Sequence, residues 1–287
     1  MSRTRFYLEG LLKLAVAAAC LVGAMAAYRL LVHPALERVL SLGTDVSSIV
    51  RRIGMLAAIV LSYWGFVQLY ERRVPLELAP RWKWMVLAAC AGAASIGVTI
   101  LVLFATGHYE VVSTRGIGPA GGVIGMLWVA AVLEEIAFRG ILFRLLEERV
   151  GTYAALLGSA IVFGAVHLSN HGTSGITMLT VTLGGLMWAG VYLLSRNIWV
   201  TAANHCFWNA TIFVVGVPLS GEDVQAQAPL ESVSHGSALW TGGGFGPEDS
   251  LVNVLVSGAI CFALWKYARR RGLFRSPPRP GAVQSGP

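Results

Sequence analysis

Three apolar stretches of the chain carry side chains of the kind that catalyse proton transfer. Glu134 and Glu135 lie in AAVLEEIAFRGILF, His167 lies in IVFGAVHLSN, and His205 lies in TAANHCFWNA. A charged residue at the centre of a bilayer costs about 2.5 to 3.5 kcal/mol on insertion scales, so these carboxylates need partners or a functional role. Carboxylate and imidazole groups on neighbouring segments are typical of a hydrolytic site.

The two adjacent glutamates are expected to differ in their roles. Neighbouring residues on a helix point about 100 degrees apart, whereas residues four apart lie on one face. Glu135 and Arg139 are four apart and are expected to form a structural ion pair. Glu134 is then left facing the interior as the reactive group.

Helical spacing also relates each histidine to another side chain. Phe163 lies four residues before His167, and Asn209 lies four residues after His205, so each pair shares a helix face. Any one of these groups alone fits a structural role, since hydrogen bonds between membrane helices contribute about 0.6 kcal/mol on average. Their concentration within residues 134 to 209 favours a common site.

The order of these motifs resembles the CAAX prenyl protease type II and bacteriocin-processing (CPBP) group of intramembrane endopeptidases, which includes proteins similar to lysostaphin resistance protein A. That group has a Glu-Glu-x-x-x-Arg helix, then Phe-x-x-x-His, then His-x-x-x-Asn or Asp. The matching segments here are EEIAFR with Glu134, Glu135 and Arg139, FGAVH with Phe163 and His167, and HCFWN with His205 and Asn209. The resemblance covers residues 122–216 and implies a multi-pass hydrolase that cleaves a membrane-associated peptide or protein tail.

The resemblance assigns the candidate residues to roles that peptide hydrolysis requires. Glu134 would activate water as a general base, and His167 would share or orient that water. His205 and Asn209 would donate hydrogen bonds to the oxyanion. The candidate catalytic set is therefore Glu134, Glu135, His167, His205 and Asn209, with Arg139 and Phe163 as structural support.

A metal-dependent mechanism uses some of the same residues. Glu134, His167 and His205 match the ligand set of many catalytic zinc sites, and the family is commonly labelled metalloprotease. The HExxH motif that supplies two ligands and a base is absent. We therefore favour a glutamate mechanism without a cofactor and keep zinc as the alternative.

Two other classes of function remain open. The first is a non-catalytic bacteriocin-immunity or partner-binding membrane protein, in which the polar residues only hold the helices together. The second is a proton-coupled transporter, because buried glutamate and histidine also build proton relays.

Composition indicates the scaffold that must position these groups. The 287 residues are 55% hydrophobic and only 13% charged, with a mean hydropathy of +0.65, which excludes an ordinary soluble enzyme. A bilayer span needs roughly 20 apolar residues, so the sequence predicts an all-α, polytopic bundle of about eight spans. These are expected at 11–32, 53–70, 84–105, 122–146, 152–168, 174–195, 198–216 and 250–268.

Five regions follow from this reading. We expect three N-terminal spans in 1–121, a four-span catalytic core in 122–216, a flexible extracytoplasmic loop in 217–249, a last span at 250–268, and a basic, disordered cytoplasmic tail in 269–287. The loop is expected to be flexible because it has five acidic residues, a triple glycine and no Lys or Arg.

The distribution of basic residues predicts the orientation. The net charge is +7, but the basic residues flank apolar segments, which makes nucleic acid an unexpected partner. With both termini in the cytoplasm of a bacterial inner membrane, 15 of the 22 basic residues lie inside. The expected partners are the bilayer and a membrane-embedded or lipidated peptide or protein substrate, and the oligomeric state is left open.

One geometric problem remains in this picture. At 1.5 Å rise per residue, Glu134 lies roughly 18 Å above the inner end of its span, His167 about 22 Å and His205 about 10 Å. Straight, parallel helices would keep these groups apart. Tilt, a helix break or a shifted boundary near Arg196 and Asn197 must therefore bring them together.

Overall fold

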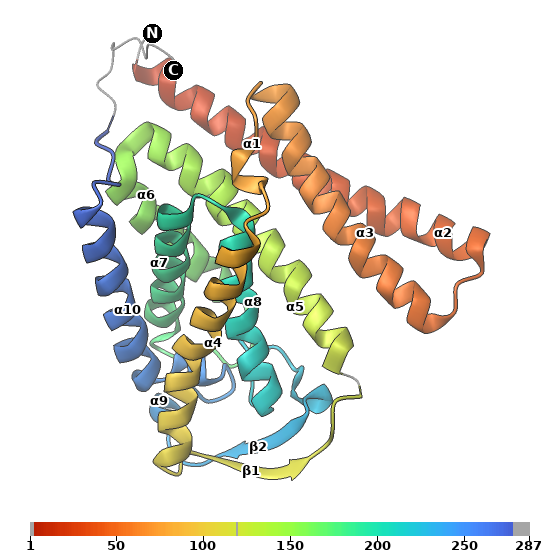
Figure 1. Ribbon diagram of the computed structural model, residues 1–287, viewed down its shortest axis with the longest axis vertical. Coiled ribbons are helices and arrows are strands. Elements are labelled where there is room, and N and C mark those ends of the chain that lie inside the picture. The colour runs from red at the N-terminus through yellow and green to blue at the C-terminus, as the bar shows by residue number, and fades with distance from the viewer. Residues whose placement is uncertain (1–2, 119, 278–287) are drawn as a thin grey trace.

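The chain folds into a bundle of long helices with a small two-stranded sheet at one end (Figure 1). The computed structural model describes residues 3–118 and 120–277. The α-helices and strands are α1 (Arg3–Ala27), α2 (His33–Leu40), α3 (Thr44–Gly65), α4 (Trp82–Ala105), β1 (Tyr109–Thr114), α5 (Ala120–Glu135), α6 (Arg144–His167), α7 (Thr177–Ser195), α8 (Ile198–Val215), β2 (Leu230–Ser234), α9 (Ala238–Thr241) and α10 (Leu251–Arg270). Three π-helical segments, η1 (Tyr28–Val32), η2 (Phe66–Tyr70) and η4 (Ile136–Phe143), continue α1, α3 and α5, and three short 3-10 helices are η3 (Leu76–Leu78), η5 (Gln225–Gln227) and η6 (Pro247–Asp249).

Seven helical runs in the described part of the chain are long and apolar enough to cross a membrane. They are Thr4–Leu40, Thr44–Tyr70, Trp82–Ala105, Ala120–His167, Thr177–Ser195, Ile198–Val215 and Leu251–Arg270. The predicted polytopic helix bundle is therefore confirmed, and the chain is a multi-pass membrane protein.

The fourth run explains why seven helical runs correspond to eight expected segments. Ala120–His167 is 48 residues long and contains 122–146 and all of 152–168 except its last residue. Its helical geometry is interrupted at Gly151, which has φ 80° and ψ 170°. A positive φ of this kind is readily adopted only by glycine. The chain changes direction here, and the rest of α6 runs beside α7 (Figure 1).

The two strands join segments that are distant in the sequence. β1 follows α4, β2 lies between α8 and α10, and the strands pair antiparallel from Tyr109 opposite Ser234 to Thr114 opposite Leu230. The sheet lies at the end of the bundle opposite the first turns of α1 and the end of α10 (Figure 1). The loops that carry β1 and β2 therefore lie on the same side of the bundle.

Residues 217–249, which we call the cap, differ from the flexible loop expected from their composition. The cap contains β2, α9 and η6, and its Glu248 and Asp249 are 8% and 0% exposed. Asp249 accepts hydrogen bonds from the hydroxyls of Thr177 and Thr180 at 2.8 and 2.6 Å. These partners, which lie on α7, satisfy the buried Asp249 carboxylate and hold this end of the cap against the bundle.

The segment expected as a disordered tail, 269–287, begins in an ordered state. Residues 269–270 complete α10, and the backbone of Arg275 then pairs with Thr152 just after the Gly151 kink. The ring of Phe274 lies 4.4 Å from that of Tyr153. Residues 278–287, including the basic Arg279, lie outside the described residues.

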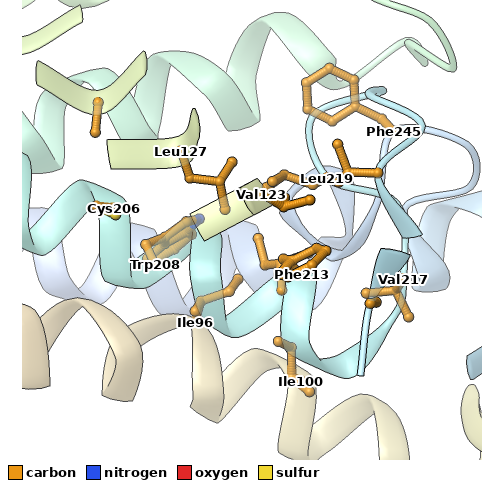
Figure 2. Close-up of a cluster of buried hydrophobic side chains, with 14 of the residues drawn as sticks. Ile96, Ile100, Val123, Leu127, Cys206, Trp208, Phe213, Val217, Leu219 and Phe245 are labelled. Atoms are coloured by element: carbon orange, nitrogen blue, oxygen red, sulfur yellow. The ribbon is translucent and has the colours of Figure 1, made fainter. Parts of the chain in front are cut away.

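Buried apolar side chains form two clusters between the helices. Figure 2 shows part of the first cluster, in which side chains from α4, α5, α8 and the cap meet around Trp208. Trp208 is 1% exposed, so α8 lies in the interior of the bundle. The labelled members are Ile96, Ile100, Val123, Leu127, Cys206, Trp208, Phe213, Val217, Leu219 and Phe245.

The close packing of α4 on α8 gives a test of the fold. A Cβ added at Gly92 would lie 2.0 Å from the backbone oxygen of Asn204, whereas a Cβ added at Gly97 would meet nothing within 4 Å. We expect Gly92→Ala to lower the free energy of unfolding by about 1–3 kcal/mol through overpacking, and Gly97→Ala to leave it unchanged or slightly higher. Thermal unfolding of the detergent-solubilised variants measures the difference, and equal midpoints would contradict the described packing.

The order of the cap can be tested through Asp249. Asp249→Ala removes a buried acceptor from two threonine hydroxyls and is expected to destabilise the protein by about 2–4 kcal/mol. Asp223→Ala removes an exposed acid of the same cap and is expected to change stability by no more than about 0.5 kcal/mol. Denaturant unfolding and limited proteolysis of 217–249 would show a selective effect of Asp249→Ala, and equal behaviour of both variants would favour a flexible loop.

Candidate active site

A buried chain of hydrogen bonds links two transmembrane helices at the centre of the site. Arg139 donates from Nη1 to Glu135 Oε1 at 2.9 Å, which confirms the ion pair expected from their spacing. The same carboxylate oxygen lies 2.9 Å from Nδ1 of His205 on α8. Because an ionised carboxylate only accepts hydrogen bonds, this contact places a proton on Nδ1 and directs Nε2 away from Glu135.

Arg139 is held by further contacts that compensate its burial. The side chain is 1% exposed, and its Nη2 donates to the carbonyl oxygen of Gly185 on α7 at 3.0 Å. Its guanidinium carbon lies 5.0 Å from the centre of the Phe163 ring and 5.8 Å from that of Trp188. Phe163 thus contacts the guanidinium of the ion pair from α6.

Glu134 lies in a different environment from Glu135, as the angle between adjacent helical residues predicts. Glu135 is fully buried, whereas the Glu134 side chain is 29% exposed and lines a cavity. Glu134 Oε2 is buried without a hydrogen-bond partner and lies 3.8 Å from His205 Nε2. A carboxylate oxygen and an imidazole nitrogen therefore face each other at the wall of the cavity.

Trp188 fixes the plane of the His205 ring. The two rings are stacked at 3.7 Å between centroids with an interplanar angle of 23°. Trp188 is 3% exposed and its Nε1 has no hydrogen-bond partner. No spacing in the sequence relates Trp188 on α7 to a histidine on α8, so the motifs do not single it out.

His167 and Asn209 reach the same cavity from α6 and α8. His167 Nδ1 lies 2.8 Å from the carbonyl oxygen of Phe163, so Nδ1 carries the proton and Nε2 remains available. The His167 ring lies 4.4 Å from the Phe163 ring. Asn209 Oδ1 is buried without a partner. Both residues therefore offer an unpaired polar group near Glu134 and His205.

The cavity itself has a volume of about 340 Å³ and lies between α5, α6, α7, α8 and the cap. Of the candidate residues, Glu134, Phe163, His167, His205 and Asn209 line it. Glu135 and Arg139 lie behind this wall. The cap contributes five lining residues that the sequence reasoning did not include, namely Leu219, Ser220, Glu222, Val224 and Glu248.

Glu248 attaches the cap to the wall of the cavity. Its carboxylate accepts hydrogen bonds from Trp208 Nε1 at 3.1 Å and from the backbone N and the hydroxyl of Ser220 at 2.8 and 2.6 Å. Burial raises the pKa of the Glu248 carboxyl, while the hydrogen bonds from Ser220 and Trp208 oppose that shift. Trp208 precedes Asn209 on α8, so the cap is connected to the helix that carries two candidate residues.

The inclination of α5 explains how Glu134 and His205, which were expected at different depths in the membrane, come into contact. α5 crosses the bundle obliquely, whereas α4, α7 and α8 run nearly parallel to one another (Figure 1). Glu134 and Glu135 are the last two residues of α5 and precede η4, whose π-helical geometry alters the turn. The glutamates of α5 therefore reach His205 because α5 is tilted. Tilt was one of the three explanations considered from the sequence, beside a helix break and a shifted boundary.

The zinc alternative would use Glu134, His167 and His205 as ligands. No group of three or more His, Cys, Asp or Glu side chains is placed to hold a metal ion within residues 3–118 and 120–277. Nδ1 of His205 and Nδ1 of His167 are both engaged, which leaves one nitrogen of each ring.

Comparisons with known proteins cover the part of the chain that carries this site. A sequence model described as type II CAAX prenyl endopeptidase, Rce1-like, matches residues 116–211. The protein named "Putative membrane peptidase YdiL" from Bacillus subtilis (strain 168) is 33% identical over 88 residues, which is 30% of this chain and 34% of that relative. The matched segment thus spans about a third of the relative's length. No solved structure matches the chain significantly.

The range matched by the family model contains the candidate residues of the site. The matched range begins just before α5 and ends within α8, so it includes Glu134, Glu135, His167, His205 and Asn209. The chain therefore carries a domain of the Rce1-like type II CAAX prenyl endopeptidase family over residues 116–211.

Proposed function

We propose that the protein is an intramembrane endopeptidase that hydrolyses a peptide bond in a membrane-embedded or lipidated peptide or protein tail. The observation that carries this proposal is the 3.8 Å approach of Glu134 Oε2 to His205 Nε2 at the wall of a cavity. The family domain over residues 116–211 supports the same class of reaction.

The two facing atoms are suited to hold the attacking water. A water molecule lies about 2.8 Å from each of its hydrogen-bond partners, so one molecule can contact two groups separated by 3.8 Å. Glu134 would take a proton from this water as it attacks the scissile carbonyl carbon. A well-placed general base of this kind typically contributes about 10²–10⁴-fold to the rate.

Charge balance assigns His205 a second role. Glu134 and Glu135 carry two negative charges, and Arg139 supplies one positive charge, so a proton on His205 makes the buried group neutral overall. In that state Nδ1 donates to Glu135 and Nε2 donates into the cavity. His205 can then stabilise the oxyanion that forms when water adds to the carbonyl.

Asn209 and His167 complete the proposed mechanism. The Asn209 amide is four residues from His205 on the same helix and would donate a second hydrogen bond to the oxyanion. His167 would orient the water or the substrate through Nε2. The proton held by Glu134 would pass to the departing amine when the tetrahedral intermediate collapses.

This arrangement favours catalysis over a purely structural role for the polar residues. Glu135 Oε1 is paired with Arg139 and His205, and the unpaired Glu135 Oε2 and Arg139 Nε belong to residues that do not line the cavity. Glu134 Oε2 and Asn209 Oδ1 are instead unpaired beside a cavity. Unpaired groups of this kind are available to a substrate.

We also propose that both termini lie in the cytoplasm. The first turns of α1 and the end of α10 lie at the same end of the bundle (Figure 1), and basic residues are enriched at the ends of the segments assigned to that side. The cap would then face the opposite side of the membrane.

The central prediction concerns Glu134. Glu134→Gln keeps the shape of the side chain but removes its basicity, so we expect cleavage of a membrane-anchored peptide library to fall by at least about 10²-fold with unchanged thermal stability.

Asn209→Ala is expected to lower kcat by about 10²–10³-fold through loss of one oxyanion donor. Mass spectrometry of products from proteoliposomes measures both.

The matched control is Glu231→Gln, which changes a half-buried glutamate of β2 that pairs with Arg115 outside the cavity and should leave activity unchanged. Each reaction is run with and without chelator. Full activity of Glu134→Gln would contradict the proposed mechanism, and chelator-sensitive activity restored by zinc would assign the reaction to a metalloprotease.

Glu135 is expected to act as a positioning residue through His205. Glu135→Gln weakens its hydrogen bonds to both Arg139 and His205, so we expect lower kcat with little change in KM, together with a loss of stability of about 1–3 kcal/mol. Steady-state kinetics on stable, reconstituted protein separate the two effects. A change confined to KM would indicate that Glu135 acts on substrate binding instead.

A further inference from the structure

A second cavity, which we call the basic pocket, lies at the end of the bundle opposite the sheet. It has a volume of about 510 Å³ and lies between α4, α7, α8 and α10. None of its described lining residues lines the cavity of the candidate active site. α4 and α8 begin, and α7 and α10 end, at this end of the bundle (Figure 1), so the basic pocket lies where these spans reach the membrane surface.

Two exposed arginines of the basic pocket have no carboxylate partner. Neither Arg81 nor Arg271 forms an ion pair with a described residue, and no Asp or Glu is among the described residues that line the pocket. Arg196, which follows the lining residue Ser195, is instead neutralised by an ion pair with Glu147. The basic pocket therefore carries positive charge that the protein itself does not balance.

Contacts with the surrounding helices position both guanidinium groups. Arg81 Nη1 donates to the carbonyl oxygen of Ser195, the last residue of α7, at 3.0 Å. The guanidinium carbon of Arg271 lies 5.9 Å from the centre of the Tyr267 ring on α10. A guanidinium has five N–H donors in a planar fork, so the bond to Ser195 leaves Arg81 with donors for an anion such as a phosphate.

The remaining surface of the basic pocket is mostly apolar. Trp84 of α4 and Tyr267 of α10 are both exposed, and these two residue types are enriched where a membrane meets water. Positive charge beside apolar surface at this level of the membrane is typical of pockets that bind anionic lipid headgroups. Aliphatic side chains come from all four helices and the segment after α10, namely Leu87, Ala88, Val191, Leu194, Val200 and Leu273.

We propose that the basic pocket binds an anionic phospholipid, with the phosphate at Arg81 and Arg271 and an acyl chain along the aliphatic side chains. Free phosphate would use the arginines alone, whereas a phospholipid also covers the apolar surface. A zwitterionic phospholipid carries a cation beside its phosphate and gains less from the two arginines. One bound lipid would contact α4, α7 and α10 together and hold their ends in place.

Lipid binding to the full, detergent-solubilised chain tests the proposal without depending on peptidase activity. The probes are dioleoyl phosphatidylglycerol and dioleoyl phosphatidylcholine, which share their acyl chains, and native mass spectrometry measures how much of each is bound. Each basic residue near an anionic lipid strengthens binding by roughly fivefold, so we expect phosphatidylglycerol to bind about tenfold or more tightly. Added phosphatidylglycerol should also raise the midpoint of thermal unfolding, because it binds the folded state.

Paired substitutions separate the basic pocket from the general positive charge at this end of the bundle. Arg81→Gln combined with Arg271→Gln is expected to reduce the preference for phosphatidylglycerol to about twofold or less. The matched control is Lys83→Gln combined with Arg270→Gln, which removes the same charge from two exposed residues outside the pocket and should leave the preference unchanged.

Arg271→Gln alone keeps the test independent of folding, because the Arg271 side chain makes no hydrogen bond within the described residues. We expect it to reduce the preference severalfold while leaving the thermal midpoint of the lipid-free protein unchanged. Equal binding of both lipids, a preference retained without Arg81 and Arg271, or an equal loss in the matched control would overturn the inference. Displacement of phosphatidylglycerol by millimolar inorganic phosphate would also overturn it, because the pocket would then bind the free anion.

Discussion

The site depends on the Glu135 carboxylate, which accepts from Arg139 and His205 at 2.9 Å each. Burying a lone carboxylate among apolar helices is costly, and burying it with two cationic or hydrogen-bonding partners lowers that cost. The contact to His205 ties α5 to α8, and the contact from Arg139 to Gly185 extends the connection to α7. This chain of hydrogen bonds leaves Glu134 and the Nε2 of His205 facing the cavity, where a reaction can use them.

The surrounding structure supports this arrangement from several directions. Trp188 stacks on His205, Phe163 contacts both Arg139 and His167, and the absence of a side chain at Gly92 lets α4 approach α8. The cap closes the cavity from the end of the bundle through Glu248. Glu134 Oε2 is unpaired and belongs to a residue that lines the cavity, so it marks where substrate or water would bind.

The helices and the ion pair between Glu135 and Arg139 could be predicted from the sequence because both depend on local spacing. Apolar length predicts the spans, and the interval of four residues predicts Glu135 with Arg139. No comparable local signal marks Trp188 beside His205 or Asp249 beside Thr177 and Thr180, since these contacts join residues far apart in the chain. Acidic composition suggested a flexible cap, but the N-cap Ser250, which accepts from the Asn253 backbone, was a local sign of order before α10.

The most direct test is nitrogen NMR of the isotopically histidine-labelled protein in nanodiscs, with His205→Ala used to assign the His205 signals. A proton held on Nδ1 by Glu135 predicts a protonated, hydrogen-bonded Nδ1 for His205 whether its Nε2 is protonated or not, and a changed signal in Glu135→Gln. A neutral His205 with its proton on Nε2 and a bare Nδ1, unaffected by Glu135→Gln, would contradict the account.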